Sequence, residues 1–274
     1  MATYPYGTRG GPAVGNALPG MPRRKDGGAS LPVTIYLDSG AGDFKIPAGF
    51  SQARIIAVGP GGTSNSRNGG GGGGLSAINT LKVNEGEVIS YVVGLAGAGS
   101  GLAGTDTTVK FRGYTLVGGA GAPGSGSTNA NGGVGSGGDI NYTGGKGGLG
   151  STGSGGGGGA AGLGGNGGNG GDANGFAGLS PAVTSGEGAG GGGGGASSAT
   201  NSVGGGGGSP GQAGGRGIGA GGFVNPSRQS WGVPPFVDQN NYNMPGFPGG
   251  GAGGYGGPGY TVGANGGVRI DLYP

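Results

Sequence analysis

Residues 144–171 read GGKGGLGSTGSGGGGGAAGLGGNGGNGG and contain almost no side chain that could be buried. Every third residue from Gly144 to Gly171 is glycine. Polyproline II has three residues per turn, so this spacing leaves one edge of such a helix without side chains. In triplets with a second glycine two edges are bare, and neighbouring backbones can approach closely. The stretch therefore predicts extended rods that pack side by side.

The same spacing recurs over residues 205–217 and 250–259, with turn-like sequences such as SPAVTSGE and SSATNS in between. We therefore predict a glycine-rich polyproline II bundle over residues 123–265. The gain and the cost of folding this bundle are nearly equal. Ordering a residue costs about 1–2 kcal/mol, and a hydrogen bond between rods contributes about 0.5–1.5 kcal/mol. A flexible glycine tether is the alternative interpretation of this region.

Glycine makes up 89 of the 274 residues, a share typical of collagen, of disordered linkers or of close-packed polyglycine. Collagen also needs proline in its repeat, and residues 144–171 contain none. The 31% hydrophobic content is high for a disordered chain. The net charge of +3 is too small and too scattered to predict nucleic-acid binding. No apolar run is long enough to cross a bilayer, so we expect no membrane insertion.

Residues 31–122 have the periodicity of strands. The stretch LPVTIYLDS alternates apolar and polar residues, and SQARIIAVG predicts a strand that is buried on both faces. Three further stretches, LSAINTLKV, EVISYVVG and TTVKFRGYTLVGG, are bounded by turn residues, and none has a helical stripe. The sequence therefore predicts an all-β protein, with a small antiparallel β-sandwich-like domain into which the polyproline II bundle is inserted.

The two ends of the chain have different predicted roles. Residues 266–274 alternate again, with Val268, Ile270 and Leu272 on one face, and such a strand needs a sheet to bury that face. We expect it to complete the β-domain, so that the glycine region is an excursion between strands of one sheet. Residues 1–30 are rich in glycine and proline and predict an extended arm for attachment.

Catalytic chemistry is not predicted. The chain has no histidine and no cysteine, which excludes imidazole bases and thiolate ligands. Glu85 and Glu87 could share one face of a strand as an acid–base pair, but a solvated turn accounts for them better. We expect no enzyme activity, no cofactor and no bound metal.

One stretch of the glycine region differs from the rest. Residues 223–247, FVNPSRQSWGVPPFVDQNNYNMPGF, contain the sole tryptophan together with other aromatic and amide side chains. Such residues on a loop are typical of recognition surfaces. The candidate receptor-binding residues are Arg228, Trp231, Phe236, Gln239, Asn240, Asn241, Tyr242, Asn243 and Phe247. The alternative is that this loop packs against the end of the bundle or against the β-domain.

The stretch FKIPAGFSQARIIAVGPGG, followed by LSAINTLKVNEGEVISYVVGLAGAG and by TTVKFRGYTLVGGAGA, resembles the glycine-rich domain of bacteriophage tail fibres and related virion proteins. This resemblance covers residues 44–122 and the closing strand at residues 266–272. The composition of residues 123–265 is similar to the packed polyglycine region of T-even-type phage fibre-tip adhesins.

The resemblance implies a virion protein, a tail-fibre or spike component that acts as a host-surface adhesin. Its expected partners are other virion proteins, through the N-terminal arm, and a host receptor that is a glycan or an outer-membrane protein. A homo-oligomer is expected, and a trimer would suit a fibre. A purely structural virion protein, such as a head decoration or a tail-tip cap, is the alternative. An ice-binding protein would need a flat Thr/Ala face, which the sequence does not predict.

Overall fold

The computed structural model describes residues 31–65, 67–126, 128–150, 153–173, 248–252 and 262–274, together with the backbone of two short strands at residues 236–237 and 243–244. The predicted arm at residues 1–30 and most of residues 174–247 lie outside the described residues. Within the described part the protein is all-β, with two antiparallel five-stranded sheets and no helix. This confirms the predicted all-β fold with its small antiparallel β-sandwich-like domain.

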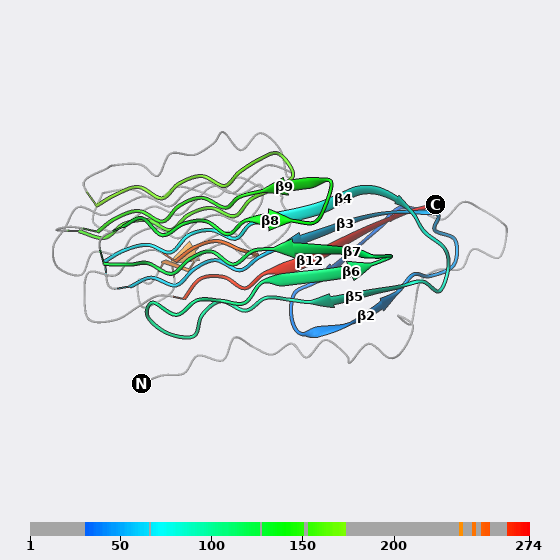
Figure 1. The fold of residues 1–274 in the computed structure, drawn as a ribbon, viewed down its shortest axis with the longest axis horizontal. Helices are drawn as coiled ribbons and strands as arrows, with labels where there is room; N and C mark the ends of the chain where they lie inside the picture. Colours follow the sequence, from blue (N-terminus) through cyan, green and yellow to red (C-terminus); the bar gives the residue numbers. More distant parts are fainter. Residues whose placement is uncertain are drawn as a thin grey trace.

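Sheet A has the order β1-β12-β3-β4-β9 and sheet B has the order β2-β5-β6-β7-β8. Both sheets lie at one end of the elongated molecule, and the glycine-rich segments extend from them to the other end (Figure 1). The strands of sheet A are β1 (Val33–Leu37), β3 (Gln52–Val58), β4 (Leu75–Lys82), β9 (Ile140–Tyr142) and β12 (Gly267–Tyr273). The strands of sheet B are β2 (Ala41–Lys45), β5 (Val88–Val92), β6 (Thr107–Phe111), β7 (Tyr114–Gly118) and β8 (Gly135–Ser136).

The closing strand β12 lies between β1 and β3, where it pairs antiparallel with both. Ile270 faces Ile35 on one side and Ile55 on the other. The predicted apolar face of this strand, Val268, Ile270 and Leu272, is fully buried. The chain therefore returns to the β-domain after the glycine region, as its alternating pattern predicts.

The main core fills the space between the two sheets and includes Ile55, Ile89 and Val109. The opposite face of β3 carries Ile56 and Val58, which pack against Ala160 and Ala161 of the glycine-rich half. The strand is therefore buried on both faces, as its continuous apolar run predicts.

Two details of the sheets go beyond the predicted strands. The stretch TTVKFRGYTLVGG forms two strands, β6 and β7, which are joined by a tight turn at Arg112 and Gly113. Both turn residues have positive φ, 45° and 82°, as a type I′ hairpin requires. The strands β8 and β9 come from the region predicted as rods, where Ile140 and Tyr142 have enough side chain to join the cluster behind β4.

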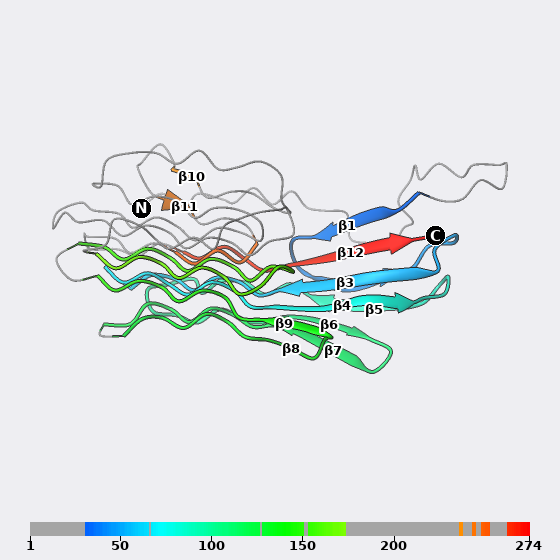
Figure 2. The same ribbon diagram turned by 90° about the horizontal axis from the view of Figure 1, so that it is seen from above.

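The glycine-rich half is an array of extended segments that run side by side along the long axis (Figures 1 and 2). We name it the glycine lattice, and its described residues are 59–65, 67–74, 119–126, 128–134, 143–150, 153–173, 248–252 and 262–266. Backbone hydrogen bonds of 2.7–3.2 Å connect these segments to one another. The lattice is thus built on backbone groups rather than on side chains.

Residues 69–74 form the central segment of the lattice, and their hydrogen bonds repeat every third residue. The amides of Gly69 and Gly72 donate to segment 143–150, those of Gly70 and Gly73 to segment 248–252, and those of Gly71 and Gly74 to segment 119–126. The carbonyls of residues 70–74 accept hydrogen bonds from three other segments, which are 59–65, 128–134 and 153–162. The central segment is therefore bonded to neighbours on every side.

The close approach of these backbones leaves no room for a side chain. A Cβ atom at Gly72 would lie 1.9 Å from the carbonyl oxygen of Gly159, and one at Gly73 would lie 1.9 Å from the carbonyl oxygen of Gly59. The lattice also extends beyond residues 123–265, because its central segment comes from the part that we assigned to the β-domain. The three-residue repeat is the one that polyproline II requires, and that backbone conformation stays a prediction.

Candidate functional site

The predicted receptor-binding loop is only partly described. Residues Phe236–Val237 form β10 and Asn243–Met244 form β11, and the two strands pair antiparallel. Phe236 is opposite Met244 and Val237 is opposite Asn243, so the fold brings two of the predicted residues into one small hairpin. The other predicted site residues lie outside the described residues, and they are Arg228, Trp231, Gln239, Asn240, Asn241, Tyr242 and Phe247.

A second candidate surface lies at the end of the lattice that is farthest from the sheets. Segment 59–65 leaves β3 toward this end, and segment 67–74 returns from it to β4 (Figure 1). Other turns end beside it, and we name this set the distal turns (residues 63–65, 67–68, 99–102, 124–126 and 128–129). Here polar side chains such as those of Thr63, Asn65 and Asn68 occur among the glycines.

The distal turns are held together by side-chain hydrogen bonds. Asn68 is buried, with 6% of its surface exposed, and its Nδ2 donates to the carbonyl oxygen of Ser125. Its Oδ1 accepts a hydrogen bond of 2.8 Å from the amide of Gly150. The Ser100 hydroxyl donates to Asn65 Oδ1 at 3.1 Å. These bonds fix several turns relative to one another, so the side chains at this end of the molecule have a defined arrangement.

One edge of the lattice carries a regular ladder of side chains. The amides of Thr143, Lys146 and Leu149 donate to the side-chain oxygens of Asn166, Asn169 and Asp172, at 2.9, 2.9 and 2.7 Å. The carbonyls of the same three residues accept hydrogen bonds from the amides that follow each Asn or Asp. The three-residue spacing of the sequence NGGNGGD is the signal from which this ladder could have been predicted.

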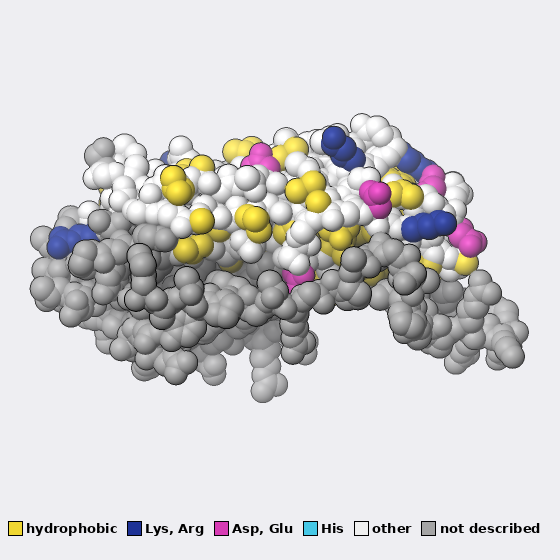
Figure 3. Space-filling model, turned by 90° about the horizontal axis from the view of Figure 1, so that it is seen from below, with side chains coloured by type: hydrophobic (Ala, Val, Ile, Leu, Met, Phe, Trp, Pro, Cys, Tyr) yellow, Lys and Arg dark blue, Asp and Glu magenta, His cyan; other side chains and the backbone are white. Residues whose placement is uncertain are grey.

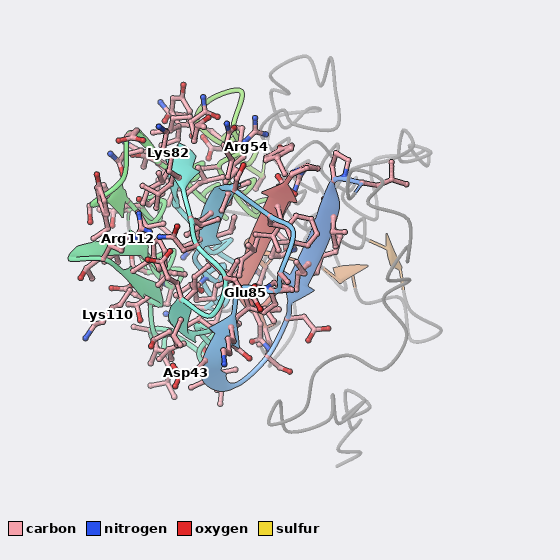
Figure 4. The ribbon with its side chains drawn as sticks, turned by 90° about the vertical axis from the view of Figure 1, so that its right-hand side faces the viewer. Asp43, Arg54, Lys82, Glu85, Lys110 and Arg112 are labelled. Carbon is pink, nitrogen blue, oxygen red and sulfur yellow. The ribbon has the colours of Figure 1, made fainter. Side chains whose placement is uncertain are left out.

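The charged side chains in view gather mainly over the sheet end (Figure 3). There Arg112 Nε donates to Glu87 at 2.8 Å, and Arg112 Nη1 donates to the carbonyl oxygen of Lys82 at 2.8 Å. Arg112 and Lys82 are on the same side of the sandwich when the molecule is seen from this end (Figure 4). The hydrogen bonds from Arg112 hold the pKa of Glu87 below its usual value, and the amide of Asn84 adds to this effect. This contact ties the β6–β7 turn to the β4–β5 turn.

Glu87 is thus occupied by a structural ion pair, which weakens its interpretation as one half of an acid–base pair with Glu85. Elsewhere in the sheets, burial raises the pKa of the Tyr91 hydroxyl, and the nearby Asp38 and Asp43 raise it further. The buried Asp271 accepts hydrogen bonds from Thr34 at 2.7 Å and from Arg269 at 2.8 Å. Its position between β1 and β3 makes it part of the sheet rather than of a cleft.

Among the described residues no group of His, Cys, Asp and Glu side chains could hold a metal ion. The same part of the chain contains no helix that could span a bilayer.

No family model matches the sequence, and no curated protein matches it. The resemblance to the glycine-rich domain of bacteriophage fibre proteins therefore stays a prediction.

Proposed function

We propose that this protein is a bacteriophage virion component, a tail-fibre or spike protein that attaches the particle to its host without catalysing a reaction. The observation that supports the proposal most is the central segment 69–74, which is bonded on all sides through backbone groups alone. A glycine lattice built in this way keeps its shape whatever the sequence of the loops at its surface. Such a scaffold suits a protein that must present exchangeable recognition loops.

Recognition requires side chains, and the lattice core has almost none. The candidate surfaces are the loop at residues 223–247 and the distal turns. Aromatic side chains in such loops supply the largest binding contributions, often about 2 kcal/mol or more each. We propose that the host receptor, a surface glycan or an outer-membrane protein, binds the aromatic loop, and that the arm at residues 1–30 joins the protein to other virion proteins, in a homo-oligomer.

The test compares adsorption with stability for the double variant Trp231→Ala/Tyr242→Ala. Particles that carry it should lose adsorption to host cells, while the purified protein keeps its melting temperature and is incorporated normally. Asn166→Ser serves as a control, because Asn166 is exposed on the lattice ladder, away from the aromatic loop in sequence. It should leave adsorption unchanged.

Two other outcomes would overturn the assignment. Normal adsorption of the double variant would remove the aromatic loop from the receptor site. A lowered melting temperature or a loss of incorporation would identify the loop as a packing element, as expected of a purely structural virion protein.

A further inference from the structure

Exposed apolar side chains are concentrated in one layer of the molecule. Among the described residues the exposed large hydrophobic side chains are Leu31, Tyr36, Val88, Val92, Leu95, Leu102, Tyr114 and Val134. All of them except Leu31 and Tyr36 come from residues 88–136, which include β5 to β8. In Figure 1 β6 and β7 pass in front of β12, and in Figure 2 they lie at the lower border of the molecule. This layer is therefore an outer surface.

The centre of this surface on sheet B is apolar. On β5, Ile89 and Tyr91 are buried in the core, so Val88, Ser90 and Val92 point to the opposite face. Val88 and Val92 are 47% and 48% exposed. A soluble protein that exposes a larger apolar patch usually uses it for binding, and Val88 and Val92 belong to the same layer as the exposed Leu95 and Leu102.

Opposite charges lie on either side of this centre. Asp43 on β2 is paired with Ser90 on β5, and Ser90 is paired with Lys110 on β6, so the three residues form one row across the sheet. The Ser90 hydroxyl donates to Asp43 at 2.6 Å, and Lys110 makes no ion pair with any described residue. Figure 4 shows the Lys110 side chain extending away from the sandwich. The row thus reads acidic, neutral, basic from β2 to β6.

We propose that the outer face of sheet B binds a second copy of this chain. A two-fold axis parallel to β5 lies between sheet B of one copy and sheet B of the other. It places β2 of each copy over β6 of the other. Asp43 then faces Lys110 of the second copy twice, while Val88 and Val92 of the two copies meet at the axis. Such a self-complementary contact is the commonest form of oligomer interface.

The neighbouring row does not oppose this arrangement. That row pairs Lys45 with Val88, and the nearest basic residue of the second copy is Arg112 in the β6–β7 turn, whose charge is already compensated by Glu87. The overlapping strands β2, β5 and β6 cover only about 14 Å by 17 Å, which is far less than the roughly 800 Å² per partner of a standard interface. Residues 94–106, which continue the layer and carry Leu95 and Leu102, therefore have to contribute to the contact.

The test is sedimentation equilibrium of the purified full chain over a range of concentrations, and it does not depend on the receptor. The wild type should show a monomer–dimer equilibrium, and Val92→Lys should weaken it at least tenfold. Leu31→Lys is the matched control, because Leu31 is 81% exposed and lies outside this layer. Each variant should melt like the wild type, since both side chains are exposed.

A charge exchange tests the pairing itself. Lys110→Glu should weaken the dimer, because it brings two carboxylates together, and the double variant Asp43→Lys/Lys110→Glu should restore it. A wild type that stays monomeric at the highest concentration, a trimer in place of a dimer, or equal weakening by Leu31→Lys and Val92→Lys would each overturn the proposal. So would a double variant that dimerises no better than Lys110→Glu.

Discussion

Ile55 in the sandwich and Gly72 in the glycine lattice are both enclosed on every side, yet by different atoms. Ile55 is surrounded by other side chains of the core, which its own side chain has to fit. Gly72 is surrounded by backbone, and a hydrogen bond of 2.8 Å joins its amide to the carbonyl of Gly145. The sandwich is thus specified by the shapes of its side chains, and the lattice by their absence.

This difference predicts opposite sensitivities. A core of side chains loses stability when atoms are removed, because a cavity remains. A lattice of backbones loses stability when atoms are added, because no neighbour can move without breaking hydrogen bonds. The removal of atoms from the sandwich and the addition of atoms to the lattice can therefore be compared in one protein under the same conditions.

The largest expected effect is that of Gly72→Ala. Its Cβ would lie 1.9 Å from the carbonyl oxygen of Gly159, so the segments have to separate. We expect a loss of about 4 kcal/mol or more, which is exceptional for one methyl group. The measurement is unfolding in denaturant, with Gly126→Ala as the control because nothing lies within 4 Å of its Cβ position. Equal stability of the two variants would favour the flexible tether.

Ile55→Ala should follow, with a loss of about 2–5 kcal/mol, because it leaves a cavity in the main core. Ile55→Val removes a single carbon from the same site and should cost about 0.5–1.5 kcal/mol. Unfolding in denaturant again provides the measurement. If Ile55→Ala lowered the free energy of unfolding more than Gly72→Ala, the sandwich would be more sensitive to substitution than the lattice.

The smallest effect concerns the Arg112–Glu87 ion pair at the sheet end. Arg112 lowers the pKa of Glu87 in the folded protein, so the stability it contributes is present above the unfolded pKa of about 4.3 and is lost as the pH falls through the lower folded value. Glu87→Gln should therefore lower the melting temperature slightly at pH 7. The difference from the wild type should shrink in acid.

Glu85→Gln is the control for this experiment, because Glu85 makes no ion pair among the described residues. A difference between Glu87→Gln and the wild type that stayed constant down to the most acidic pH would contradict the assignment. Salt should also reduce the difference, since the pair is partly exposed.

The strands could be predicted because apolar side chains leave a pattern in the sequence. Alternation identified β12 and its buried face, and a continuous apolar run identified β3. Pairing across the lattice could not be predicted in the same way, since a run such as residues 69–74 looks identical in every register. Gly165 illustrates the limit: it belongs to the predicted three-residue spacing, yet nothing lies within 4 Å of its Cβ position.

The candidate site follows the same logic. Composition identified the aromatic loop, and the structure places Phe236 and Asn243 in one hairpin. The distal turns could not be found from the sequence, because Asn68 and Ser125 meet only after the lattice has brought their segments together. Local patterns predict elements, whereas contacts between elements far apart in the chain need the fold.

The position of β12 also bears on the order of events during folding. Gly70 and Gly73 donate hydrogen bonds to Ala252 and Gly249, so the hydrogen bonds of the central segment are complete only when residues far along the chain have docked. The gap between β1 and β3 in sheet A is likewise filled only by residues 267–273. Contacts between such distant residues slow folding, because long loops have to close first. Both the central segment and sheet A are therefore completed only when residues 249–252 and 267–273 dock, and we expect this step to be slow.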